Sequence, residues 1–411
     1  MLGIFRYFTI AMFCAVSCQA YSLDEGGRLS FTEKEKAVIQ SLVLGVQGSV
    51  RKDPSNLQAG NPLAVKLGKY IFNDPKFSKN GKVSCAKCHQ ENRSFTDGLS
   101  KAFGLHRTNR NTPSLYGVGL QDWFYWGGRR DSLWSQALVP FEVAAEMGVD
   151  RLFVVKRVFD HPVYSPLYFS IFGEKMALPL SEFPDNAGPF GSNLTISNWG
   201  KLSAVHKKMI NRAFSNVGKV IAAYERTLTY PHSAFDVFAD ELLKEKNASG
   251  EGLSISAQKG LKLFIDSNST RCIQCHNGPR FSNGGFHNIG TGSFSGNDID
   301  LGRSLGMAAV VLDEFNCLGE YSDAPKVQCR ELRFMQNDPH NMSRGAFKTP
   351  SLRNVSKTGP YYHDGRFKSL DEVIRYYQKP PATPYGKTHE LTPLTLTPLE
   401  IDNLLDFLRE L

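Results

Sequence analysis

The chain has 411 residues, of which 48 are Lys or Arg and 40 are Asp or Glu, so its formal net charge is +8. This length allows two or three domains, each able to bury a core of its own. The basic residues are spread along the sequence and form no dense run. We therefore expect a solvated surface and no nucleic-acid binding, although a basic rim could steer an acidic protein partner.

Residues 1–20 have the pattern of an export signal. Arg6 precedes an apolar stretch over residues 7–16, and small and polar residues follow up to Ala20. We predict cleavage after Ala20 and a periplasmic location. Lipidation at Cys18 is the alternative, because the residues before it loosely fit a lipoprotein signal. Only that lipid would attach the protein to a membrane, since no other segment has the roughly 18 consecutive apolar residues of a membrane helix.

Two Cys-x-x-Cys-His motifs follow, formed by Cys85, Cys88 and His89 and by Cys272, Cys275 and His276. Haem attachment requires two thiols that reach the vinyl groups on one porphyrin edge, and an adjacent imidazole that binds the iron. A zinc site would need further ligands at suitable spacing, and a thioredoxin-type motif does not call for His after both pairs. The chain is therefore predicted to be an exported redox protein with two covalent haem c groups, in which His89 and His276 bind iron.

Matching segments surround the two motifs and indicate an internal duplication. A helix is predicted before each motif. Downstream, the sequence Thr-Pro-Ser-Leu at Thr112 recurs at Thr349, and the segment that begins at Trp126 recurs at His363, with the same offset along the chain. The two haem motifs are separated by a shorter distance than this offset, so the second half carries an insertion after its motif.

The insertion contains Cys317 and Cys329. In an oxidising compartment these two residues can form a disulfide that closes a short loop, and two buried free thiols are the alternative. We favour the disulfide.

Extending the same offset places Tyr377 opposite Pro140. If the element after each repeat reaches over its haem, the Tyr377 phenolate would bind the second iron, whereas Pro140 has no side-chain donor. The adjacent Tyr376 points about 100° away on a helix, so only one of the two tyrosines faces the iron. One haem would then be closed and six-coordinate, and the other would have an open face for a small oxidant such as hydrogen peroxide.

The expected fold is mainly α, with two cytochrome-c-like haem domains that are related by an internal repeat and whose haems face a shared interface. Amphipathic patterns predict helices over residues 201–228, 234–243, 256–264 and 398–408. The polar stretch 245–254 is the predicted boundary. The segments are a signal peptide (1–20), an N-terminal segment (21–60), an N-terminal haem c domain with the peroxide site (61–244) and a C-terminal haem c domain with the Tyr-ligated haem (245–411).

From about residue 60 to its end, the chain resembles the bacterial di-haem cytochrome c peroxidase and MauG superfamily. That family has a Trp between the haems, a Gln ten residues later, then a Pro, and then a Glu in the peroxide pocket. Trp126, Gln136, Pro140 and Glu146 stand at this spacing. The resemblance implies that Glu146 and Gln136 assist proton movement between the peroxide oxygens, and that Trp126 relays electrons between the haems.

The resemblance also implies one calcium ion between the haems, bound by Asn111 and by the carbonyls of Thr358 and Pro360. Family members divide by the distal ligand of the second haem, which is Met in ordinary peroxidases and Tyr in MauG-type enzymes. Tyr377 occupies that place and no Met follows Met342, so the chain resembles the Tyr-ligated, MauG/MbnH-like branch.

These features predict a periplasmic di-haem c-type oxidoreductase that uses hydrogen peroxide. Its high-valent haem iron would oxidise an aromatic side chain of a partner protein, or a small electron-donor protein. The alternative is a di-haem electron-transfer protein without peroxide chemistry, which needs a sixth ligand on the first haem. His106 is the only nearby candidate, and we interpret it as a loop residue; we interpret His363 as a packing or haem-edge residue.

Overall fold

The computed structural model describes residues 23, 28–45, 52–173, 180–244, 252–292, 299–335, 342–381 and 389–411. Ala20 and Cys18 of the predicted export signal lie outside these residues, as do residues 245–251 of the predicted boundary. Across the described ranges, no helix is both long enough and apolar enough to cross a membrane.

The described chain is mainly helical, as predicted. The first half contains α1 (Glu33–Leu42), α2 (Pro62–Asn73), α3 (Cys85–Cys88), α4 (Leu133–Glu142), α5 (Arg151–Phe159), α6 (Tyr164–Phe172), α7 (Asn193–Lys201) and α8 (Ala204–Glu225). The second half contains α9 (Ala234–Leu243), α10 (Ile255–Ile265), α11 (Cys272–Cys275), α12 (Arg303–Leu312), α13 (Arg330–Arg333), α14 (Leu370–Gln378) and α15 (Pro398–Arg409). Two short strands, β1 (Phe286–His287) and β2 (Phe347–Lys348), pair antiparallel with Phe286 opposite Lys348.

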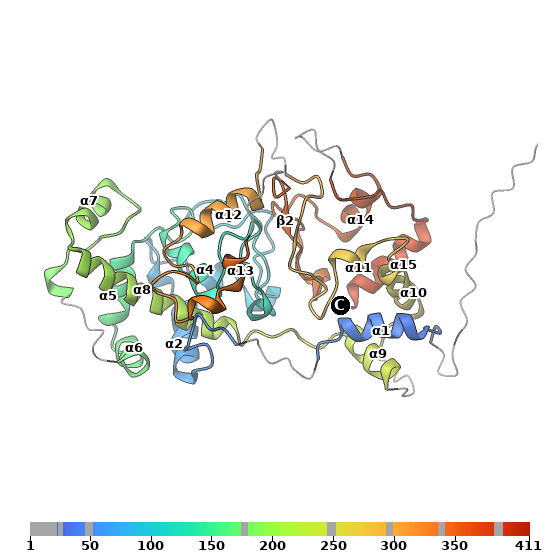
Figure 1. Cartoon of the computed structure of the whole chain (residues 1–411), viewed down its shortest axis with the longest axis horizontal. Helices are drawn as coiled ribbons and strands as arrows, with labels where there is room; N and C mark the ends of the chain where they lie inside the picture. The colour runs from blue at the N-terminus through green and yellow to red at the C-terminus, as the bar shows by residue number, and fades with distance from the viewer. Residues whose placement is uncertain are drawn as a thin grey trace, which may run out of the picture.

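The side chains form two separate hydrophobic clusters. Figure 1 shows the helices that carry them side by side along the long axis of the molecule. The first cluster is built from α2, α4, α5 and α8, and the second from α1, α9, α10 and α15. The division of the chain at residue 245 stays a prediction. The second cluster includes α9, which lies before that boundary, and α1 from the N-terminal segment.

Helices α4 and α14 are equivalent members of the repeat. Each begins after a serine whose hydroxyl accepts a hydrogen bond from the backbone N–H three residues later, Ser132 from Ser135 and Ser369 from Glu372. The two caps are separated by the same offset as the other repeated segments, so both helices start in the same register. Pro140 and Tyr377 are consequently the eighth residues of their helices.

The turn before each of these helices is also repeated. Tyr125 and Tyr362 both have left-handed backbone conformations, with φ of 67° and 72°. Each of them follows a one-residue antiparallel bridge that closes the turn, Phe124 with Arg130 and Tyr361 with Phe367. This shared geometry places Trp126 and His363 at equivalent points of the two halves.

A close helix crossing supports the haem loop in each half. A Cβ atom at Gly68 of α2 would overlap the backbone carbonyl of Val220 in α8, and a Cβ atom at Gly260 of α10 would overlap the carbonyl of Asn403 in α15. Only glycine permits this approach of the two backbones. The crossing fixes the position of the helix that leads into each haem motif.

The insertion in the second half packs against the first half. Phe315 and Tyr321 belong to the first hydrophobic cluster, and the Ser135 hydroxyl of α4 donates to Asp313, the residue after α12, at 3.1 Å. Figure 1 shows α12 in the half of the molecule that contains α4. The predicted disulfide between Cys317 and Cys329 is confirmed, with a Cα–Cα distance of 5.6 Å. The backbone N–H of Cys317 donates to Asp131 at 2.7 Å.

Buried charges hold the insertion in place. Arg151 of α5 pairs with Glu314 at 2.5 Å, and Lys219 of α8 pairs with Asp323 at 2.6 Å. Both cations are almost fully buried. Arg151 also pairs with Glu142 at 2.9 Å, whereas Asp323 is the one carboxylate paired with Lys219 among the described ion pairs, so removing Asp323 would leave a buried charge uncompensated.

Replacing Gly68 with Ala tests the helix crossing. We expect Gly68→Ala to lower the free energy of unfolding by about 1–3 kcal/mol, because the added methyl group overlaps backbone that cannot rotate away. Thermal or urea unfolding of the holoprotein measures the change.

Gly200→Ala is the matched control, because no atom lies within 4 Å of the place that its Cβ would occupy in α7. The control should keep or raise stability, by up to about 1 kcal/mol, through helix propensity. Equal unfolding free energies for the two variants would contradict the close crossing.

Candidate active site

Both haem motifs orient their histidine in the same way. Nδ1 of His89 lies 3.0 Å from the carbonyl oxygen of Phe95, and Nδ1 of His276 lies 3.0 Å from that of Phe281. Because a carbonyl only accepts hydrogen bonds, each Nδ1 carries the proton and each Nε2 keeps its lone pair for a metal. Burial lowers the pKa of both rings, that of His276 to about 4, which favours the neutral form that binds iron.

A cavity of about 310 Å³ lies between the two halves and brings together most of the residues predicted for the second haem and its surroundings. Its walls include Cys272, Cys275, His276 and Tyr377, together with Trp126, His363, Asn111, Thr358 and Pro360. Two thiols, an imidazole with a free Nε2 and a phenol on the walls of one cavity are the donors that a covalent haem c requires. The residues therefore fit the implied group.

The structure separates the two adjacent tyrosines of α14. Tyr377 lines the cavity, whereas the Tyr376 hydroxyl donates to the carbonyl of Ile289 at 2.7 Å. Burial raises the pKa of the Tyr377 phenol, so its ionisation would need a nearby cation. A ferric haem iron would supply that cation, and Tyr377 is thus the better placed of the two residues.

Glu146 is held beside the first haem motif by backbone pairing. The Leu105 N–H donates to the carbonyl of Glu146 at 3.0 Å. Burial raises the pKa of the Glu146 carboxyl above its ordinary value, and the positive charge of Arg129 offsets part of this rise. Burial, followed by the charges of Asp97 and Glu146, raises the pKa of the Cys88 thiol to about 12, which indicates that the Glu146 carboxyl lies close to the motif.

Gln136 and Pro140 lie in α4, the equivalent of the tyrosine-bearing helix. The Gln136 carbonyl accepts a hydrogen bond from Tyr125 at 3.2 Å, but its side-chain Oε1 is buried and has no partner within the described residues. A buried acceptor of this kind suits a donor from a bound molecule or water. Pro140 offers no side-chain donor or acceptor at the position of Tyr377.

Trp126 lies at the junction of the two halves. Its indole N–H donates to the carbonyl of Asn111 at 3.0 Å, and the Asn111 N–H donates to the carbonyl of His363 at 2.9 Å. Asn111 thus connects Trp126 with His363, the equivalent residue of the repeat. His363 itself is buried and stacks on Phe347 at 3.7 Å, which agrees with a packing role at the cavity edge.

The predicted calcium ligands meet in the same cavity. Asn111 donates through its Nδ2 to the carbonyl of Leu99, which leaves Oδ1 available. The described residues contain no cluster of three or more His, Cys, Asp or Glu side chains that could hold a metal. Three oxygens from Asn111, Thr358 and Pro360 would need waters to reach the six to eight ligands of calcium. The calcium site stays a prediction.

Two further residues near these sites were not predicted. Arg129 lies with its guanidinium 4.1 Å from the Tyr125 ring centre and lowers the pKa of Glu146. Lys348 lines the cavity, and its amine donates to Gln121 at 2.7 Å. Arg129 recurs as Arg366 in the repeat, and this recurrence was the signal that could have identified it.

The two tyrosines provide a matched test of the second haem ligand. Tyr377→Phe should change the absorption and electron paramagnetic resonance spectra of one haem only, because it removes the phenol oxygen from the cavity wall. Tyr376→Phe should leave both haem spectra unchanged and should cost about 0.5–1.5 kcal/mol of stability through one lost hydrogen bond. Unchanged spectra in Tyr377→Phe would contradict the assignment.

Comparison with known proteins identifies the family. The model of the family described as "Di-haem cytochrome c peroxidase" matches residues 62–244. The methylamine utilization protein MauG of Methylorubrum extorquens is 30% identical over 356 residues, which cover 85% of this chain and 79% of that protein. The cytochrome-c peroxidase IdrP1 of Denitromonas iodatirespirans is 29% identical over 363 residues, which cover 87% of this chain and 84% of that protein.

The fold is similar to the crystal structure of a MauG-like protein associated with microbial copper homeostasis. That structure superimposes with a TM-score of 0.57 at 24% identity, covering 87% of this chain and 93% of the other. Together with the two haem motifs, these findings show that the chain belongs to the di-haem cytochrome c peroxidase and MauG family and is a di-haem oxidoreductase of the peroxidase type.

Proposed function

We propose that this protein is a periplasmic oxidoreductase that takes oxidising equivalents from hydrogen peroxide and delivers them to a partner protein. The observation that carries the proposal is the inequality of the eighth residues of α4 and α14. Pro140 leaves the distal face of the first haem without a protein ligand, whereas Tyr377 can close the second. Peroxide needs an open coordination position, and only the first haem offers one.

At the first haem site, His89 would hold the iron, and the side chains of Glu146 and Gln136 handle protons. The haem, when bound, supplies the redox chemistry that reduces hydrogen peroxide to water. Glu146 accepts a proton from the peroxide, and the unpartnered Oε1 of Gln136 accepts a hydrogen bond from it. Returning that proton to the departing oxygen assists cleavage of the O–O bond.

At the second haem site, His276 and Tyr377 would hold the iron. A phenolate ligand favours oxidised iron, so this haem suits the storage of oxidising equivalents. Trp126 connects the two sites through the junction at Asn111. The equivalents then pass to a partner protein's aromatic side chain or to a small electron-donor protein.

Two observations support the remaining parts of the proposal. The disulfide between Cys317 and Cys329 suits an oxidising compartment, which agrees with export to the periplasm. The convergence of Asn111, Thr358 and Pro360 on the cavity between the halves agrees with one calcium ion that rigidifies this junction.

The competing function, a di-haem electron carrier, requires a sixth ligand on the first haem. His106 was the only nearby candidate in the sequence, and its side chain is exposed. Its backbone N–H is bound to the carbonyl of Ala145 at 2.9 Å, which fixes the loop. The exposed side chain of His106 favours the peroxide-dependent enzyme over the electron carrier.

The pH dependence of the peroxide reaction tests the role of Glu146. The carboxylate form accepts the proton, so the second-order rate with peroxide should rise as pH increases through the pKa of Glu146, which burial raises. Arg129→Gln removes the cation that lowers this pKa, so the midpoint of the rise should move to higher pH. Glu146→Gln should abolish the rise and slow the reaction about 10²–10⁴-fold.

Stopped-flow mixing of the ferric holoprotein with hydrogen peroxide measures these rates. Glu91→Gln, which neutralises an exposed carboxylate close to the first motif, is the matched control and should react like the native protein. A native rate in Glu146→Gln, or a midpoint that moves to lower pH in Arg129→Gln, would contradict the proposed role.

A further inference from the structure

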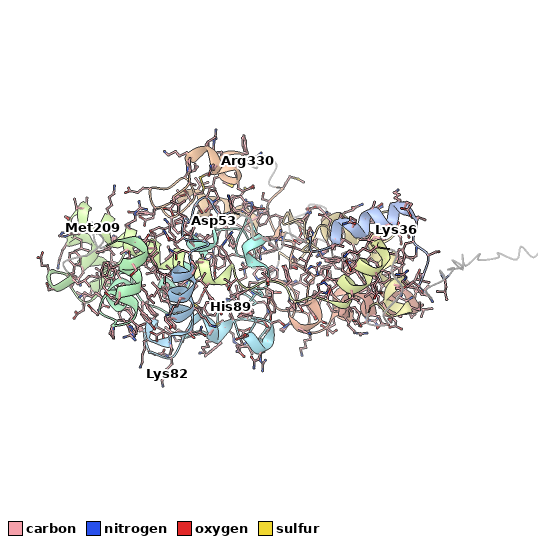
Figure 2. The ribbon with its side chains drawn as sticks, turned by 90° about the horizontal axis from the view of Figure 1, so that it is seen from below. Lys36, Asp53, Lys82, His89, Met209 and Arg330 are labelled. Carbon is pink, nitrogen blue, oxygen red and sulfur yellow. A yellow bond between two sulfur atoms is a disulfide. The ribbon has the colours of Figure 1, made fainter. Side chains whose placement is uncertain are left out.

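A buried carboxyl stands without a hydrogen-bond partner at the end of α8. Glu225 is the last residue of this helix and is 4% exposed, and its Oε2 atom has no partner within the described residues. Figure 2 shows Met209, near the start of α8, far out in the half of the molecule that contains His89. Burying an unpaired carboxyl costs free energy, so Glu225 is a candidate for a functional role.

The two helix crossings give α8 and α15 a common register. The crossing glycine of α2 lies against the carbonyl of Val220 in α8, and that of α10 lies against the carbonyl of Asn403 in α15. Glu225 is the fifth residue after the first of these carbonyls, and Leu408 is the fifth residue after the second. Glu225 and Leu408 are therefore equivalent residues of the repeat.

Ring contacts support this register. Tyr224 packs on Phe72 of α2, with 5.2 Å between the ring centres. Phe407 packs on Phe264 of α10, also with 5.2 Å between the ring centres. Tyr224 and Phe407 directly precede the two equivalent residues, so the side chains as well as the backbones of the two halves correspond.

The second half shows what the shared position faces. Leu408 lines the cavity whose walls include Cys272 and His276. Leu404, one helical turn earlier, lines the same cavity. The common register turns Glu225 toward the first haem motif in the same way. The first haem site thus has a carboxyl where the second has an apolar side chain.

The charges and rings around the first motif agree with this placement. Burial, followed by the charge of Glu225, raises the pKa of the Cys85 thiol. The ring of Phe72, on which Tyr224 packs, lies 6.4 Å from the ring of His89. Glu225 therefore lies close to the residues that would hold the first haem.

The protein supplies no counter-charge to this carboxyl. Burial raises the pKa of Glu225 to about 8, and no cation or hydrogen-bond donor of the described residues lowers it. The adjacent Arg226 interacts with Asp53. Other charged groups that act on the first motif or on the tyrosine before Glu225 are Lys87, Glu91, Asp97 and Glu146.

Lys87 is the one cation in this set, and its amine donates to the carbonyl of Gly104 at 2.9 Å. The cation that would favour the ionised form of Glu225 therefore has to come from a bound group. Ferric haem iron is such a cation, and ferrous iron carries one positive charge less.

We propose that Glu225 couples reduction of the first haem to the uptake of one proton. The carboxyl is ionised beside ferric iron. When an electron from a reduced donor reaches this site, Glu225 takes one proton from solvent, so one electron and one proton enter together. Leu408 can take no proton at the equivalent place. An ionised Glu225 disfavours reduction and keeps the first haem ferric, the form that meets peroxide; the inference rests on the proposed function only for this benefit.

The test is a spectroelectrochemical titration of the holoprotein without peroxide, from about pH 5 to about pH 10. The first haem is identified as the one whose spectrum is unchanged in Tyr377→Phe. Its reduction potential should fall as pH rises toward about 8, the pKa to which burial brings Glu225, and should level off above it. Where the potential falls, the equilibrium constant for reduction should drop up to about tenfold per pH unit, or about 59 mV for one electron.

Glu225→Gln keeps the shape of the side chain and removes its proton exchange. We expect the first haem to lose this pH dependence and its equilibrium constant for reduction above about pH 8 to rise about tenfold or more, with the second haem unchanged. Glu225→Asp should keep a pH-dependent potential. Glu91→Gln, which neutralises an exposed carboxylate close to the same motif, is the matched control and should keep the native potentials.

An undiminished pH dependence in Glu225→Gln would assign the proton to another group, such as a haem propionate, and would overturn the proposal. Equal shifts of both haems, or the same shift in Glu91→Gln, would also overturn it. If Glu225→Gln does not retain haem, Glu225→Leu gives the same test with the residue that the second half carries. Because peroxide is absent, a protein that shows the coupling but does not react with peroxide would support the inference and contradict the proposed function.

Discussion

The difference between the two haem sites depends on the serine caps that start α4 and α14 in the same register. Because Ser132 and Ser369 accept equivalent hydrogen bonds, the eighth residue occupies the same position in each helix, and Tyr377 thereby lines the cavity of the second haem motif. The side chain there is Tyr377 in one half and Pro140 in the other. A repeated scaffold would therefore hold two chemically different iron sites, which a peroxide-dependent enzyme requires and a simple electron carrier does not.

Contacts between the two halves connect the second haem cavity with the first half of the chain. Asn111 accepts from the Trp126 indole and donates to His363, so the loop after the first haem motif connects both halves of the repeat. The insertion adds a second connection, because Glu314 and Asp323 neutralise buried cations of the first half. Both connections keep the relative position of the two haem sites fixed, on which electron transfer between them would depend.

Much of the site was predictable because it is local. The haem motifs, the constant offset of the repeat and the choice of Tyr377 over Tyr376 follow from spacing along the chain, and helices such as Ala234–Leu243 follow from their apolar period. Contacts between distant segments were not predictable. The packing of α9 with the second cluster and the approach of Arg129 to Glu146 arise from tertiary structure, which no apolar period along the chain reports.

We expect one haem to have a protein ligand on both faces and the other to have one on a single face. Electron paramagnetic resonance of the ferric holoprotein at low temperature resolves the two irons and therefore tests this difference. The expected spectrum has one high-spin signal from the haem bound by His89 and one low-spin signal from the haem bound by His276 and Tyr377. Two low-spin signals that do not change when hydrogen peroxide is added would contradict it.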